Sequence, residues 1–118
     1  MKKAILINVK EETITEVIVT KDLKGSQLQS IYGLLGCNLV DIVNVGENDI
    51  YVDDEGLLSL DNNSKLFSYK GHYQPLAGNG LIMGYDNNTG DSIDVTITLD
   101  EVKKNVKFLT INDVTTMF

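Results

Sequence analysis

The sequence predicts an α+β fold, in which a small antiparallel or mixed β-sheet has two helices packed on it. Several short segments rich in β-branched residues are separated by polar turns, which is typical of strands joined by hairpins. Two other segments carry helix-start signals, and one of them also has apolar residues at helical spacing. The length of 118 residues matches one domain, so we expect a single domain over residues 1–118.

The first predicted element is a hairpin. Residues 2–9 and 13–20 are rich in Ile, Val and Thr, and the charged residues 10–12 separate them. Branched side chains favour strands, and a short polar break between two such runs favours a turn. We therefore expect the chain to begin with two antiparallel strands.

The clearest helix signal comes next. Apolar residues recur at positions 28, 31, 32 and 35, which places them on one face of a helix over residues 27–35. Ser26 and Gln29 have the spacing of a capping box, in which each side chain meets a backbone N–H at the helix start. Gly36 stands where helices commonly end in a left-handed residue. We expect this helix to pack on the sheet.

The middle of the chain predicts further strands. Residues 39–45 form a β-branched run that is suited to an interior strand. A polar turn separates this run from residues 50–52, and the two segments predict a second hairpin. Residues 66–69 predict a short strand, and residues 81–83 predict a core strand after a tight turn.

The last predicted elements are a strand and the second helix. Residues 92–97 alternate like a strand. Thr98 and Glu101 form a second capping box, which predicts a helix through about residue 106. The tail from Phe108 is compatible with a short strand or with a frayed end.

The charged residues argue against a nucleic-acid partner. The formal charge of −7 comes from 17 acids against 10 bases, and every base is a lysine. Arginine is the side chain that grips phosphate or guanine with a planar fork, whereas lysine offers a point charge. We therefore expect no binding to duplex nucleic acid, and a solvated acidic surface.

The apolar segments and the single cysteine predict a cytoplasmic protein. No stretch approaches the roughly 20 apolar residues that cross a bilayer, so we expect no membrane partner. The apolar run of residues 4–7 is too short for a secretory signal. Cys37 has no second cysteine to pair with, which fits a reducing compartment, here the cytoplasm of a host cell.

The sequence contains no recognisable catalytic or metal-binding machinery. His72 is the only histidine, so a hydrolytic triad would depend on that residue alone. The acidic residues miss the spacing of a calcium loop, and one histidine with one cysteine does not make a zinc site. The glycines at 78, 80 and 84 miss the dinucleotide fingerprint by one residue. We expect no enzymatic activity, no metal and no cofactor.

Residues 69–84 hold the densest set of ligand-type side chains in the chain. Tyrosine rings can stack on a planar ligand, and glycines let a ligand approach the backbone. The alternative is structural: half-buried tyrosines of a sheet and a tight turn before a core strand give the same pattern. The predicted ligand-binding residues are Tyr69, Lys70, His72, Tyr73, Gln74, Gly78, Asn79 and Gly80.

The second half of the chain resembles a family of small uncharacterised proteins of bacteriophages and mobile elements. The resemblance rests on residues 50–57, on the PLAGNGLIMG segment at residues 75–84, and on the expected helix that is followed by Phe108. The family has no established catalytic residues. The resemblance implies an accessory protein that counters host defences, either by sequestering a nucleotide-derived immune signal or by blocking a host protein.

Together these observations predict a counter-defence protein that binds and sequesters a small nucleotide-derived signalling molecule without cleaving it. A homo-oligomer is expected, because a pocket between subunits encloses a ligand better than one small domain does. The alternative is an acidic inhibitor that blocks a host defence enzyme by protein–protein contact, which acids gathered on one face would favour. A third hypothesis is a nucleotide-cleaving enzyme, which requires His72 near a carboxylate and a pocket.

Overall fold

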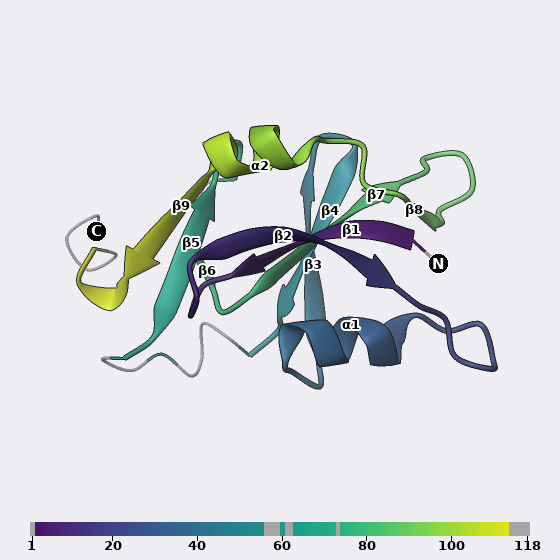
Figure 1. Ribbon diagram of the computed structural model, residues 1–118, viewed down its shortest axis with the longest axis horizontal. Coiled ribbons are helices and arrows are strands. Elements are labelled where there is room, and N and C mark those ends of the chain that lie inside the picture. Colours follow the sequence, from purple (N-terminus) through teal and green to yellow (C-terminus); the bar gives the residue numbers. More distant parts are fainter. Residues whose placement is uncertain (1, 56–59, 61–62, 73, 114–118) are drawn as a thin grey trace.

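The computed structural model describes residues 2–55, 60, 63–72 and 74–113. Antiparallel strands form two sheets, and helices cover them from opposite sides (Figure 1). The two main helices are α1, Leu28–Leu35, and α2, Leu99–Asn105. The strands are β1 Lys2–Asn8, β2 Thr13–Val19, β3 Val40–Val45, β4 Asn48–Asp53, β5 Lys65–Tyr69, β6 Leu76–Ala77, β7 Gly80–Tyr85, β8 Ser92–Ile93 and β9 Val106–Thr110.

The larger sheet has the strand order β2-β1-β7-β4-β3, and β8 pairs with β7 outside this path. The hairpins β1–β2 and β3–β4 confirm both hairpins expected from the sequence. The expectation that residues 39–45 form an interior strand is wrong, because β3 lies at the edge of the sheet beside β4. The central strands are instead β1, β7 and β4, which have a neighbour on each side.

The two faces of the larger sheet are buried by different partners. Tyr51, Leu81 and Met83 pack with α1 on one face. Ile50 and Ile82 point to the other face, where they join the core shared with the smaller sheet and α2. Strands that are covered on both faces have near-continuous apolar runs. This explains why β4 and β7 are buried almost throughout and show no clean alternation.

Helix α1 forms where its apolar spacing predicts, but it begins differently. Its N-cap is Gln27, which makes no side-chain cap, and the hydroxyl of Ser26 accepts from the N–H of Leu28 at 3.3 Å. The predicted capping box of Ser26 with Gln29 is therefore wrong. Gly36 ends the helix with a φ of 72°, which confirms the predicted left-handed cap.

The smaller sheet has the strand order β6-β5-β9. Phe67 of β5 is fully buried and joins the core beneath the larger sheet. Helix α2 begins at the predicted cap, since the hydroxyl of Thr98 accepts from the N–H of Glu101 at 3.2 Å. It ends at Asn105, and the chain continues directly into β9.

The C-terminal part of the described chain adds a helical turn at residues 111–113, which the sequence did not predict. The Asp113 carboxylate accepts hydrogen bonds from the backbone N–H and the hydroxyl of Thr110, at 2.8 and 3.0 Å. The hydroxyl of Thr110 in turn accepts from the N–H of Asp113 at 3.3 Å. This reciprocal capping explains why β9 ends at Thr110.

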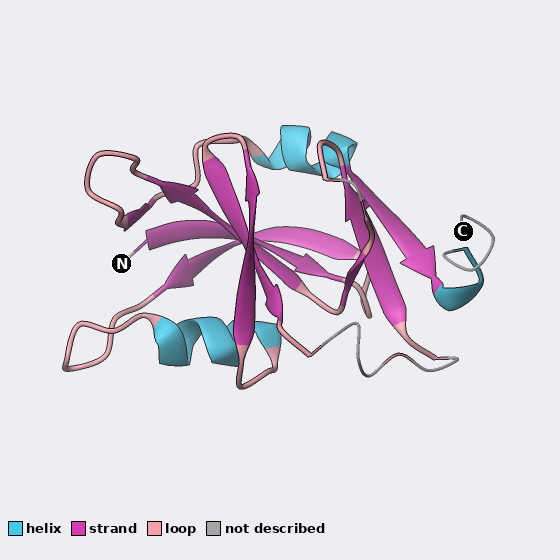
Figure 2. Ribbon diagram, turned by 180° about the vertical axis from the view of Figure 1, so that it is seen from behind, coloured by secondary structure: helices cyan, strands magenta, loops and turns pink. Residues whose placement is uncertain are grey.

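The expected strand at 92–97 is shorter than predicted. Only Ser92 and Ile93 pair with β7. Beyond them, Asn48 and Thr96 hold each other by two hydrogen bonds of 2.9 and 3.0 Å, which tie the segment to β4. Figure 2 shows this connection leading from β8 over the sheet to α2. Neither main helix is long and apolar enough to cross a membrane, as far as the described residues show.

Candidate functional site

Tyr69 and Lys70, the first of the predicted ligand-binding residues, have contacts within the fold. Tyr69 is buried, and its hydroxyl accepts from the side-chain amide of Asn105 at 3.4 Å. The N–H of Lys70 donates to the carbonyl of Asn105 at 3.0 Å, while the Lys70 side chain is exposed. These bonds hold the end of β5 to the end of α2.

Gly78, Asn79 and Gly80 connect β6 to β7. Gly78 has a φ of +80°, which glycine adopts at no steric cost. The Asn79 side chain accepts from the N–H of Val9 at 3.0 Å. A side chain on Gly80 would meet the ring of Phe67, so this glycine permits close packing between β7 and β5. In the structure, the close approach that Gly80 allows is to Phe67 of the chain itself, whereas Gly78 has open space around its Cβ position.

His72 and Gln74 line a small hollow, which we call the acidic cavity. The N–H of His72 donates to the carbonyl of Tyr69 at 3.0 Å, and this turn places the imidazole beside the end of β4. Tyr73 lies outside the described residues. The cavity has a volume of about 190 Å³, and its lining residues are Asp41, Val43, Val52, Asp53, Asp54, His72, Gln74, Leu76 and Ala77.

The acidic cavity is a poor match for a nucleotide. Its volume lies below the roughly 300 Å³ at which small-molecule pockets begin. The carboxylates of Asp41, Asp53 and Asp54 would repel a phosphate group. Among the described residues, no three His, Cys, Asp or Glu side chains are arranged to hold a metal ion.

The lone cysteine lies next to the end of α1, in a hollow that shares Asp53 with the acidic cavity. Cys37 is half-buried and packs against the core beneath α1. Burial raises the pKa of the Cys37 thiol, and the nearby Asp53 carboxylate raises it further, while a hydrogen bond with the backbone of Leu39 acts in the opposite direction. A thiol held protonated in this way is a weak nucleophile at neutral pH.

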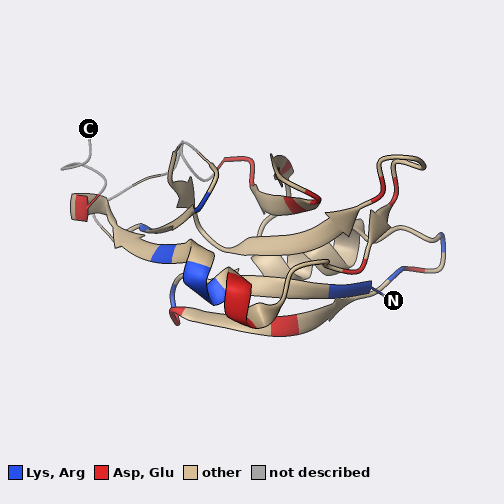
Figure 3. Ribbon diagram, turned by 90° about the horizontal axis from the view of Figure 1, so that it is seen from above, with Lys and Arg blue, Asp and Glu red and all other residues tan. Residues whose placement is uncertain are grey.

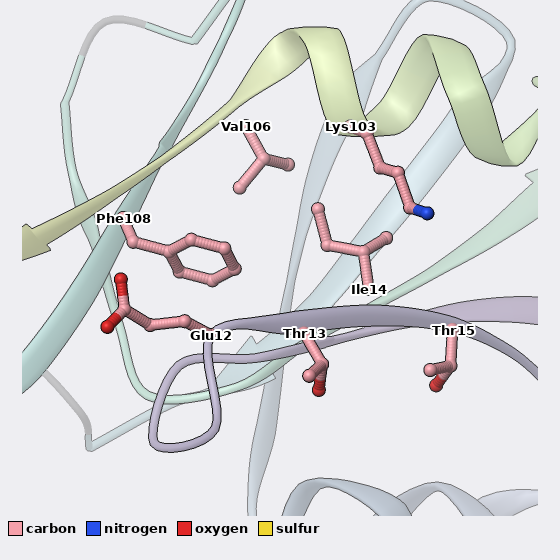
Figure 4. A pocket seen from close by; sticks show the side chains of 7 residues that line it. All are labelled: Glu12, Thr13, Ile14, Thr15, Lys103, Val106 and Phe108. Atoms are coloured by element: carbon pink, nitrogen blue, oxygen red, sulfur yellow. The ribbon is translucent and has the colours of Figure 1, made fainter.

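A larger hollow lies between the two sheets, and we call it the β2–β9 groove. Strand β2 is the last strand of the larger sheet, and β9 is the last strand of the smaller one. The two edges diverge beneath α2 and leave a space of about 490 Å³ (Figure 4). Its lining residues are Glu12, Thr13, Ile14, Thr15, Lys103, Val106 and Phe108.

The walls of the groove are apolar, and its two ends carry opposite charges. Ile14, Val106 and Phe108 are half-buried and belong to the outer layer of the core. Figure 4 shows the Glu12 carboxylate beside the Phe108 ring, and the Lys103 ammonium group at the other end, above Ile14.

Strand β2 borders the groove with its backbone. The side chains of Thr13 and Thr15 point away from the hollow in Figure 4, as alternation along a strand requires, so these residues contribute main-chain atoms to the lining. As the last strand of its sheet, β2 has one edge without a neighbouring strand among the residues that the structure describes, and N–H and C=O groups on such an edge are available to a ligand. The groove thus combines an aromatic wall, two charged ends and main-chain hydrogen-bonding groups.

Sequence reasoning missed this groove because its two sides lie about 90 positions apart in the chain. Residues 12–15 were assigned to a hairpin, and residues 103–108 to a helix and its tail. Only the pairing of β9 with β5 places Val106 and Phe108 opposite β2. The sequence showed only a charged break at residues 10–12, and the left-handed conformation of Glu12 became visible only in the structure.

A protein-family model described as "Domain of unknown function (DUF3846)" matches residues 1–107, which include both the groove's hairpin and helix α2. No curated protein and no solved structure matches the chain.

Proposed function

The chain belongs to the DUF3846 family, a family of unknown function, and we propose that it binds a small nucleotide-derived molecule in the β2–β9 groove without cleaving it. The observation that carries this proposal is the make-up of the groove. An apolar space of about 490 Å³ lies within the size range of small-molecule sites, which are mostly apolar with a few placed polar groups.

The groove offers one partner for each part of a nucleotide. The Phe108 ring provides a face on which a base stacks, and such stacking is worth about 1–3 kcal/mol. The Lys103 ammonium group provides a positive charge for one phosphate. The exposed edge of β2 provides main-chain donors and acceptors for the sugar.

The lining also favours binding over chemistry. The groove's lining residues include no histidine or cysteine, and the two threonine side chains point away from the hollow. Glu12 and Lys103 lie at opposite ends, so neither is placed to activate a nucleophile for the other. A ligand that enters this groove would leave it unchanged.

The setting that we propose is sequestration of a host immune signal by a phage or mobile-element protein. The support is the resemblance of residues 50–57 and 75–84 to proteins of such elements, together with the non-catalytic groove. The alternative, an acidic inhibitor of a host enzyme, has less structural support than ligand binding in the groove. Figure 3 shows acidic residues on several separate segments, whereas the alternative needs them on one face.

Isothermal titration calorimetry with AMP, GMP, CMP and UMP tests the proposed site. At the ceiling of about 0.3 kcal/mol per atom, a ligand of about 24 non-hydrogen atoms reaches a Kd of about 5 μM, so the titrations should cover concentrations from this value upward. We expect at least one mononucleotide to bind, and Lys103→Gln to weaken it about tenfold. Lys70→Gln, a matched change in the 69–84 segment, should leave the Kd unchanged.

The variants separate the groove from the 69–84 segment. If Lys70→Gln raises the Kd and Lys103→Gln does not, the ligand binds at the 69–84 segment and not in the β2–β9 groove. No heat with any mononucleotide would contradict the proposed function. The homo-oligomer stays a prediction, which sedimentation velocity checks, and the groove does not depend on it because one chain supplies every lining residue.

A further inference from the structure

We propose that Glu12 makes the β2–β9 groove selective for guanine, as the group that binds the hydrogen-bond-donor edge of the base. This inference rests on the proposed function and adds the identity of the base to it. Three observations carry it: the backbone conformation of Glu12, the anchoring of its turn, and the separation of Glu12 from Lys103.

Glu12 has a φ of 53°, and it is the one non-glycine residue with a positive φ among the residues that the structure describes. A side chain in this left-handed region costs free energy, and glycine or asparagine is usual at such a turn position. Strained residues of this kind gather at functional sites, where the side chain has a purpose that offsets the strain. At this position the strain places a carboxylate at the mouth of the groove.

The turn that carries Glu12 is anchored from two sides. The N–H of Val9 donates to the Asn79 side chain at 3.0 Å, and the N–H of Glu11 donates to the Asn8 side chain at 3.0 Å. The Glu12 carboxylate itself forms no hydrogen bond or ion pair with another residue of the described part of the chain. The turn is held in place, and the acceptor oxygens remain available to a ligand.

Guanine is the base whose edge suits a carboxylate. Its N1–H and its exocyclic N2 amine are adjacent donors that a carboxylate binds with both oxygens. The same edge of adenine places the acceptor N1 beside its amine, so one carboxylate oxygen would face a lone pair. With the base stacked on Phe108 beside Glu12, the phosphate of a mononucleotide extends toward Lys103 at the other end.

The test compares the Kd values of GMP and AMP for the wild type, Glu12→Gln and Glu12→Gly. We expect the wild type to prefer GMP by about tenfold or more, as a two-oxygen contact to one base provides. Both variants should lose this preference, and neither should bind AMP more weakly than the wild type, because the carboxylate makes no two-oxygen contact with adenine. Glycine relieves the positive φ, so Glu12→Gly should melt no lower than the wild type, and Glu12→Gln checks the result with a side chain of the same size.

Two outcomes would overturn the inference while leaving the proposed function in place. One is equal, measurable binding of GMP and AMP by the wild type. The other is a preference for GMP that survives in Glu12→Gly, which would place the discriminating group elsewhere. If neither GMP nor AMP binds, the selectivity fails, and the titration with CMP and UMP then decides whether the proposed function fails with it.

Discussion

The side-chain oxygen of Asn79 accepts a hydrogen bond from the backbone N–H of Val9, 70 positions away in the chain, at 3.0 Å. This bond joins the connection between β6 and β7 to the turn between β1 and β2. Asn79 was predicted to bind a ligand directly. Its position suggests an indirect contribution, because it supports the turn that carries Glu12.

We expect Asn79→Ala to lower the free energy of unfolding by about 1–3 kcal/mol, since Val9 is buried and its N–H would lose its partner. Asn79→Asp is the matched control, because a carboxylate oxygen can still accept the bond. Urea unfolding measures both variants. Equal stability of Asn79→Ala and the wild type would show that the bond does not hold the turn.

Two glycine-to-alanine changes should have opposite effects. A Cβ on Gly84 would collide with the backbone carbonyl oxygen of Asp94. We therefore expect Gly84→Ala to lower the free energy of unfolding by about 1–3 kcal/mol. Gly33 lies in α1 with open space around its Cβ position and no positive φ. Gly33→Ala should therefore raise the free energy of unfolding by about 0.5–1 kcal/mol. Thermal unfolding compares the two variants. A Gly84→Ala variant as stable as the wild type would contradict the close crossing of residues 93–94 over β7.

The Cys37 thiol should react slowly with iodoacetamide at neutral pH. Burial and the Asp53 carboxylate both raise its pKa, so the thiolate that reacts is scarce below the raised pKa and increases as the pH rises through it. Asp53→Asn removes one of these causes and should speed the reaction at pH 8. A Cys37 that reacts as fast as a free thiol at neutral pH would contradict the raised pKa.

Replacement of Phe108 by leucine should distinguish the affinity that comes from a base stacked on the ring from the affinity that comes from apolar packing in the groove wall. Leucine keeps an apolar group in the groove wall but has no ring, so we expect the Kd for the bound nucleotide to rise about tenfold. Lys107→Gln is the control on the same strand, because its side chain alternates to the face away from Phe108. Equal affinities of Phe108→Leu and the wild type would exclude a stacked base on this ring.

The sequence predicted most of the local structure, because local structure follows from spacing and capping. Residues 28–35 carry a full apolar stripe, and the Thr98 hydroxyl caps the second helix as expected by accepting from the N–H of Glu101. The position of β3 within the sheet was predicted wrongly, since its β-branched residues look the same in an edge strand as in an interior one. The apolar run of β7 was the better signal for the centre of the sheet, whereas β4 has no more apolar residues than β3.

The candidate site was beyond local sequence patterns. The polar residues of 69–84 are close together in sequence, and that proximity made them the predicted site. In the structure, Asn79 and Tyr69 bond to distant parts of the fold, while His72 and Gln74 line the acidic cavity. The β2–β9 groove arises only because β2 and β9 are the last strands of two different sheets in the described part of the chain, which depends on the pairing of strands far apart in the sequence.

The central claim is that a nucleotide binds in the β2–β9 groove, and amide chemical shifts during separate titrations with AMP, GMP, CMP and UMP test it most directly. We expect the largest shifts at residues 12–15 and 103–108, on both sides of the groove. Residues 70–74, beside the acidic cavity, should shift little. Shifts centred on residues 70–74, or no shifts at millimolar nucleotide, would contradict the claim.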